Sequence, residues 1–195
     1  ELGFITGPVA FQSDYGERYD FDTNSGNVGI GIGLLHYMNF AYRDDCNCYS
    51  ADKYWNDHFK IRSEIDYHVT TLNHLGTEAD ELSLGGLQLR SMQGKARVFE
   101  AGAQVEWYPL SVRDFQEGGL KIAPYVGFGA HYVNYRPEAT STLGPLGNPI
   151  TTFPTFIDQI DTSRGNAIAL VADLGFRYKI SPLSDILISS KWHYY

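Results

Sequence analysis

Long apolar runs are missing from this sequence of 195 residues. No stretch reaches the roughly 18 consecutive apolar residues that a membrane-spanning helix needs, which excludes a helical membrane protein. A membrane β-barrel is not excluded, because its apolar residues alternate with polar ones and never form a continuous run.

Basic residues are also scarce: 15 Lys and Arg stand against 23 Asp and Glu, for a formal net charge of −8. Phosphate binding needs a basic face, so we expect no nucleic-acid partner. The chain length fits one domain, which we place over residues 1–195.

Cysteine occurs only at Cys46 and Cys48, in an expected loop. A disulfide across one residue is strained. A metal site would need further ligands, for which Asp57 and His58 are the nearest candidates. An oxidised pair or two inert thiols are favoured over a metal site, and we expect neither a metal nor a cofactor.

A period of two runs through most of the chain. Between Val28 and Tyr42 the even positions are largely apolar, and the odd positions begin with three glycines. Such a run is far longer than the typical strand of about 5–6 residues and has the length of a tilted membrane strand. The same alternation predicts strands over 59–71, 99–107, 120–132, 168–178 and 185–194, and a shorter first strand that begins with Leu2 and Phe4.

The charges lie on one face of these predicted strands. The apolar face has no Asp, Glu, Lys or Arg. The other face has eleven, which are Lys60, Arg62, Glu64, Asp66, Glu100, Glu106, Lys121, Asp173, Arg177, Asp185 and Lys191. A soluble barrel or sandwich would place apolar residues inside. We therefore predict an all-β, closed, antiparallel transmembrane barrel, with the charges as an ion-pair network that fills the interior.

Aromatic residues mark the expected membrane interfaces. If the first strand runs outward from the periplasm, Tyr42, Trp107 and Tyr178 lie at periplasmic strand ends, while Tyr132 and Trp192 lie toward the outer ends. Two such belts are typical of outer-membrane barrels. The outer loops are then 13–27, 75–95 and 137–166, and the inner connections are 43–58, 110–119 and 181–184.

Seven strands are predicted, whereas single-chain bacterial barrels have an even number. Tyr195 also falls on the inward face, unlike a C-terminal aromatic residue that faces lipid. We therefore expect that residue 195 is not the natural C-terminus and that a fourth outer loop and an eighth strand follow it.

Histidines are the candidates for catalysis. His36 alone interrupts the apolar face of the second strand, while His68 and His131 point inward among carboxylates, where hydrogen-bonded packing is expected. His74 is predicted at the outer rim, where a lipid-modifying enzyme could place a base. No motif pairs His74 with a nucleophile, so we expect no catalytic residue.

The segment Ser13-Asp14-Tyr15-Gly16-Glu17-Arg18, with Phe59–Arg62 and Leu84–Ser91, resembles an uncharacterised outer-membrane β-barrel family of Bacteroidota, mainly flavobacteria. Its members are similar in layout to OmpA-like barrels and to the PorG-like barrels that accompany type IX secretion. The resemblance implies no catalytic residues, and Cys46-Asn47-Cys48 is not a feature of the family.

These observations predict a non-catalytic accessory or scaffold subunit of a larger bacterial outer-membrane complex, for secretion, outer-membrane protein assembly or uptake. The expected partners are membrane lipid, lipopolysaccharide, and other outer-membrane proteins or lipoproteins. Two alternatives stay open: a lipid-modifying enzyme with a histidine at the rim, and a small-solute channel lined by the inward charges.

Overall fold

The computed structural model describes residues 1–10, 15, 21–39 and 53–195. Several predicted features therefore lie outside the described residues: Ser13, Asp14, Gly16, Glu17 and Arg18 of the first-loop motif, together with Tyr42, Cys46 and Cys48.

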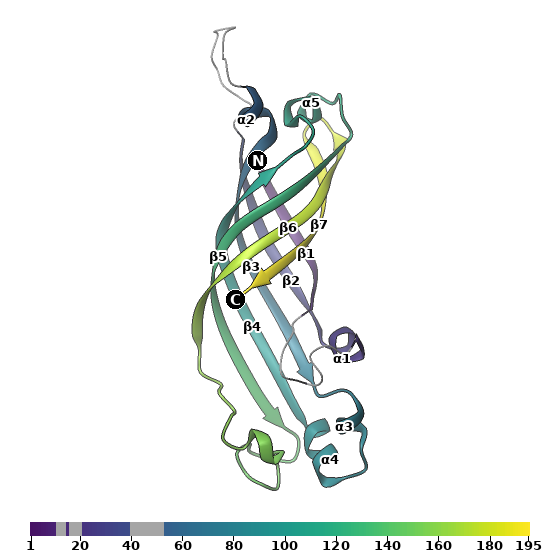
Figure 1. Ribbon diagram of the computed structural model, residues 1–195, viewed down its shortest axis with the longest axis vertical. Helices are drawn as coiled ribbons and strands as arrows, with labels where there is room; N and C mark the ends of the chain where they lie inside the picture. The colour runs from purple at the N-terminus through teal and green to yellow at the C-terminus, as the bar shows by residue number, and fades with distance from the viewer. Residues whose placement is uncertain (11–14, 16–20, 40–52) are drawn as a thin grey trace.

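Seven antiparallel strands form one sheet in which each strand pairs with its neighbours in sequence (Figure 1). Their bounds are β1 (Leu2–Ala10), β2 (Val28–Asn39), β3 (Phe59–Asn73), β4 (Met92–Trp107), β5 (Ile122–Ser141), β6 (Gly165–Ser181) and β7 (Ser184–Tyr194). The sheet curls into a nearly closed barrel, so the prediction of an all-β barrel is confirmed.

The barrel wall stays open between β1 and β7, which do not pair with each other. Seven alternating strands make β1 and β7 run in the same direction, so an antiparallel pairing between them is impossible. β7 ends before β6 does. Tyr194 pairs with Leu170, and the first five residues of β6 continue beyond this pair toward the other end of the barrel. The C-terminal end of β7 consequently lies partway along the barrel (Figure 1).

Short helices lie at both ends of the barrel (Figure 1). One end, named here the α5 end, has α2 (Lys53–His58), α5 (Val112–Gln116) and the tight β6–β7 turn. The other, named the α4 end, has α1 (Phe21–Gly26), α3 (Thr77–Asp80), α4 (Leu84–Ser91) and the 3-10 turn η1 (Pro154–Phe156). Ser83 and Ser111 begin α4 and α5 by accepting hydrogen bonds from backbone N–H groups. No helix among the described residues is long and apolar enough to cross a membrane.

Three strands extend at least three residues further toward the α4 end than the sequence predicts. β4 begins at Met92 instead of 99, β5 continues to Ser141 instead of 132, and β6 begins at Gly165 instead of 168. The prediction failed there because the outward positions become polar, as at Gln93, Lys95 and Arg97 on β4, and the hydrophobic period stops while the strand pairing continues.

The wall is apolar outside and polar inside. Large apolar side chains on the outer surface are exposed, including Phe4, Leu34, Phe128, Ile168 and Leu170. The largest fully buried side chains are instead mostly polar, with Arg62, Lys60, His131, Gln104 and Glu106 among them. This distribution is the reverse of that in a water-soluble barrel.

Candidate functional site

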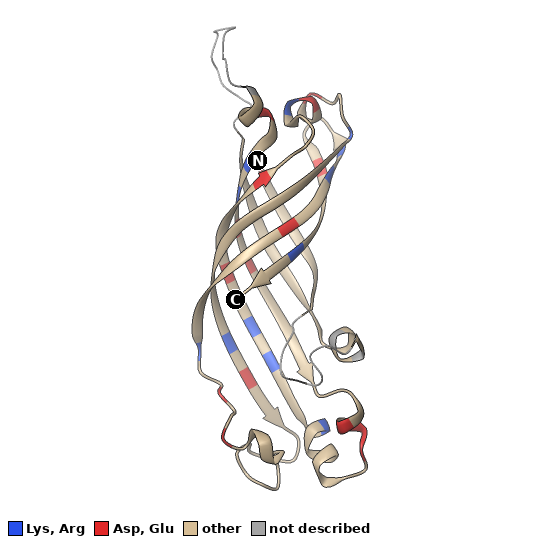
Figure 2. Cartoon of the chain, in the orientation of Figure 1, with Lys and Arg blue, Asp and Glu red and all other residues tan. Residues whose placement is uncertain are grey.

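The barrel interior contains the candidate functional site, because strand pleating sends the charged side chains inward. Figure 2 shows charged residues along the strands as well as at both ends. Ten of the eleven charged residues predicted for the interior network are buried or half-buried: Lys60, Arg62, Glu64, Asp66, Glu100, Glu106, Asp173, Arg177, Asp185 and Lys191.

Lys121 is the exception, and the prediction was wrong for it. The residue precedes the first residue of β5, and its side chain is exposed at the α5 end. Alternation places a side chain inside only where the wall encloses it. Asp185 at the start of β7 does face inward and contacts Arg177 at 2.8 Å.

Arg62 is the centre of the most deeply buried group. Its Nε lies 3.1 Å from Glu64 Oε2 and its Nη1 lies 2.9 Å from Glu106 Oε1. Nη2 donates to Asp173 Oδ2, and the Tyr125 hydroxyl donates to the same oxygen at 3.3 Å. The four charged side chains are 0% exposed. We call these five residues the Arg62 cluster.

A second group of charges lies toward the α5 end. Lys60 Nζ and Arg177 Nη1 contact Glu1 Oε2 at 3.1 and 3.0 Å. The Arg177 guanidinium also stacks on the Tyr37 ring, 4.4 Å from its centroid. Burial by itself raises the pKa of the Glu1 carboxyl, but Lys60 and Arg177 outweigh it and lower the pKa from 4.5 to about 2.

Apolar side chains cover this group at the α5 end. Val112 and Phe115 of α5 pack with Tyr108, Ala123 and Tyr125, all nearly fully buried. The Tyr108 hydroxyl donates to Glu106 Oε2 at 2.6 Å. The helix thus covers the interior charges at this end of the barrel.

Lys191 of β7 joins the opposite side of the lumen to β3. Its Nζ donates to Glu64 Oε1, and to Asp66 Oδ2 at 3.0 Å. Because β7 and β3 are separated by three strands in the sheet, this contact crosses the barrel interior.

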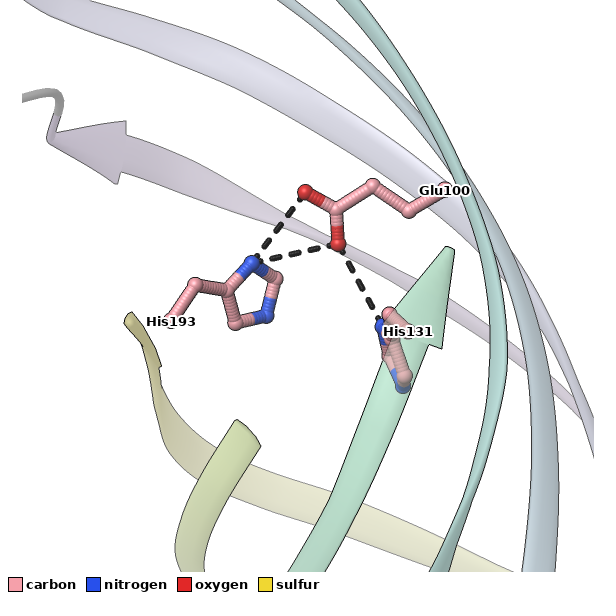
Figure 3. Close-up of side chains that lie close together, drawn as sticks. All are labelled: Glu100, His131 and His193. Carbon is pink, nitrogen blue, oxygen red and sulfur yellow. Dashed lines mark hydrogen bonds and ion pairs between the residues drawn. The ribbon is translucent and has the colours of Figure 1, made fainter. Parts of the chain in front are cut away.

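Glu100 of β4 lies at the centre of a different arrangement, made of three histidines and a tyrosine. Its carboxylate is 3.4 Å from His68 Nε2, 3.3 Å from His131 Nδ1 and 3.1 Å from His193 Nδ1. The Tyr195 hydroxyl donates to Glu100 Oε1 at 3.0 Å. Figure 3 shows the two nearest imidazole nitrogens turned toward the carboxylate. We call these five residues the Glu100 cluster.

Strand register brings the Glu100 cluster together. Glu100 pairs with Asp66 and with Val133, so His68 and His131 are its diagonal neighbours on the same inward face. His193 pairs with Val171 on β6 and reaches Glu100 across the lumen. Gly102 makes room for the His131 ring, because a Cβ there would overlap it.

The interior has an excess of carboxylates. Its basic members are four, Lys60, Arg62, Arg177 and Lys191, and its acidic members are seven, Glu1, Glu64, Asp66, Glu100, Glu106, Asp173 and Asp185. Within the described part of the chain, six of the seven contact a lysine or an arginine. Glu100 alone contacts only histidines and a tyrosine.

The aromatic residues predicted for the two belts are exposed where the structure describes them: Trp107, Tyr132, Tyr178 and Trp192. Trp107 and Tyr178 lie near the α5 ends of their strands. Tyr132, expected near a strand end, lies mid-strand because β5 continues to Ser141. It does mark the end of the apolar surface of β5, since the next outward residues are Asn134 and Arg136.

The rim histidine lies among aromatic rings. His74 is 8% exposed, with the rings of Tyr15 and Phe156 at 4.6 and 5.6 Å between centroids. Burial lowers the pKa of His74 below its usual value. His36, by contrast, is exposed on the outer face of β2.

Some interior residues are not identified by the sequence analysis. Glu1 precedes the first strand, and Tyr37, Gln104 and Tyr125 are uncharged members of inward faces. The inward positions of Tyr37, Gln104 and Tyr125 could be read from the same period of two, whereas that of Glu1 could not. Their partners could not, because those partners are far apart in sequence.

Comparison with known proteins gives no guide to the site, since no protein-family model, curated protein or solved structure matches the chain.

Proposed function

We propose that this chain is an outer-membrane β-barrel that acts as a non-catalytic accessory or scaffold subunit of a larger outer-membrane complex. One observation carries the proposal: the wall is apolar outside and charged inside. Apolar residues facing water would be costly in a soluble protein of this size, whereas hydrocarbon stabilises them. An Arg or Lys on a lipid-facing surface costs about 2–4 kcal/mol at the midplane, and the predicted lipid-facing positions have none.

Basic residues beyond the apolar surface also support the proposed location in an outer membrane. Lys95, Arg97 and Arg136 lie on the outward side of β4 and β5 toward the α4 end, with Glu138 contacting Arg97 at 2.9 Å. Anionic phosphates of lipopolysaccharide would complement such a group. We infer that the α4 end faces the cell exterior, with membrane lipid around the apolar surface.

A scaffold is favoured over a channel or an enzyme. The side chains of Arg62, Glu64 and Glu106 are 0% exposed, so protein atoms fill the lumen at their level. His74, the base of the enzyme alternative, is buried against aromatic rings. The α4 end, with its helices and long loops, offers surface for the protein partners of a secretion, assembly or uptake complex.

An eighth strand would complete the barrel. Since β1 and β7 run in the same direction, one further strand antiparallel to both would pair with each and close the wall. Closure removes the two unpaired edges, which is how membrane barrels satisfy their backbone groups.

The test is to tag the native protein, extract outer membranes in mild detergent and identify what copurifies in stoichiometric amounts. A defined set of secretion, assembly or uptake subunits supports the scaffold. A lone monomer contradicts it. Gel migration that differs between boiled and unboiled samples is expected of the barrel itself, and identical migration would contradict membrane insertion.

A further inference from the structure

We propose that Glu100, His131 and His193 form a binding site for one divalent transition-metal ion of the Zn²⁺ class, with a structural role. The inference goes beyond the scaffold function and does not depend on membrane insertion, because all its ligands lie inside the barrel. One carboxylate and two imidazoles are a donor set that Zn²⁺ accepts in proteins.

The donor atoms already converge. One ligand atom from each of the three residues lies within 4.8 Å of the others. Ligand atoms about 2.0–2.1 Å from a tetrahedral ion are themselves about 3.3–3.4 Å apart. The carboxylate lies 3.3 Å from His131 Nδ1 and 3.1 Å from His193 Nδ1, longer than a strong charge-assisted hydrogen bond of about 2.7–2.9 Å. Small movements would therefore admit an ion between them (Figure 3).

The local charge favours a cation. Glu100 and His131 are 1% exposed, and in the described chain Glu100 has no lysine or arginine partner. A buried carboxylate without a cation is costly. The carboxylates elsewhere in the interior already outnumber the basic groups, so an added positive ion also reduces the excess.

The surroundings suit a site held by the fold. Val98, Val133 and Ala169 form a buried apolar layer one inward position further along β4, β5 and β6. His68 Nε2 and the Tyr195 hydroxyl both contact Glu100 Oε1, so they fix the carboxylate or supply a further ligand.

The position of the site defines its role. Among the described strands β7 pairs with β6 alone, whereas the proposed ion joins β7 to β4 and β5 across the lumen. An ion that binds the folded barrel but not the unfolded chain raises the free energy of unfolding by mass action. The expected consequence is that bound metal holds β7 in the wall.

The experiment uses the refolded full chain with a histidine-free affinity tag, stripped by chelator and titrated with Co²⁺, then with Zn²⁺ as competitor. We expect one equivalent of Co²⁺ with visible d–d absorption of a low-coordinate site, displaced by Zn²⁺, and a higher unfolding temperature with Zn²⁺. Glu100→Gln, His131→Gln and His193→Gln should each lower the affinity by more than the roughly 10–100-fold that the loss of an outer-shell partner costs.

Two control variants locate the ion. His36→Gln removes an exposed histidine from the outer face, and Cys46→Ser with Cys48→Ser removes the two thiols; both should bind as the wild type does. Gel heat-modifiability and circular dichroism identify which ligand variants are folded. His193→Gln, near the C-terminal end of β7 and half-buried, is the ligand variant expected to disturb folding least. The proposal is overturned by an absence of saturable binding, by binding that persists in folded His193→Gln, or by a loss of binding in either control.

Discussion

The Arg62 and Glu100 clusters lie in the same lumen but differ in the groups that partner their buried charges. Arg62, whose guanidinium stays charged, contacts three carboxylates, so its cluster is held together by ion pairs around one fixed cation. Glu100 is surrounded by three imidazoles and a phenol, and imidazole nitrogens are common metal ligands. The difference indicates that the Arg62 cluster maintains the barrel, whereas the Glu100 cluster is suited to binding.

Arg62→Met should have the largest effect, because it leaves Glu64, Glu106 and Asp173 without their shared cation. Removing one partner of a buried pair costs about 3–5 kcal/mol, which we expect in urea unfolding of the refolded protein. Arg97→Met is the matched control: its bridge to Glu138 is about one-third exposed, and we expect a loss of no more than about 1 kcal/mol.

Urea unfolding of Glu100→Gln tests whether the Glu100 cluster contributes less to stability than the Arg62 cluster does. Glutamine keeps the shape of the side chain and removes its charge, so this variant should unfold much closer to the wild type than Arg62→Met does. Equal losses in the two variants would show that both clusters are structural in the same way.

Both clusters lie behind a wall whose outer face is apolar, and Leu34→Arg tests whether that outer face contacts lipid. Leu34 is 63% exposed and pairs with Phe4 and Ile65 in the middle of the outer face. We expect a loss of about 2–4 kcal/mol in folding into lipid vesicles. Gln93→Arg, on the polar part of β4, should fold normally. If Leu34→Arg instead folds well in water without detergent, the membrane assignment fails.

Gly102→Ala should disturb the Glu100 cluster selectively. The added methyl group would overlap the His131 ring and the carbonyl oxygen of Ala130. We expect a loss of about 1–3 kcal/mol in unfolding, together with weaker Co²⁺ binding. Gly7→Ala is the control, since no atom lies within 4 Å of a Cβ there. A Gly102→Ala protein that matches Gly7→Ala in both measurements would contradict the packing described.

Glu1→Gln should have the smallest effect and a characteristic pH dependence. Because the pKa of Glu1 is lowered from 4.5 to about 2, its contribution to stability is present above pH 4.5 and is lost as the pH falls toward 2. The side chain is 38% exposed, so solvent screening keeps the difference from wild type below about 1 kcal/mol at neutral pH. Unfolding curves of the two proteins should converge near pH 2; a constant difference would point to another cause.

The strands could be predicted from sequence where the hydrophobic period is strong, and their ends could not where it weakens. The predicted run 59–71 lies within β3, whose last residue is Asn73, because apolar and charged faces alternate along most of it. On β5 the alternation of apolar residues ends at Tyr132, yet backbone pairing with β4 continues to Ser141. Pairing depends on the neighbouring strand, which the local pattern does not contain.

The candidate site was predicted in part. His68 and His131 were expected inside among carboxylates, where the structure places both against Glu100. His193 was assigned to an inward face but not to this cluster. The presence of Glu1 in the interior was not expected at all, because it lies outside any alternating run.

The sequence by itself determined which face of each strand is apolar, since pleating turns successive side chains to opposite sides whatever the strand pairs with. Only the tertiary structure decided which inward side chains meet. Glu100 and His193 are 93 residues apart. They come into contact because the registers of β4 to β7 and the curvature of the sheet together place His193 opposite Glu100 across the lumen. That placement depends on the whole wall and is not encoded in any one strand.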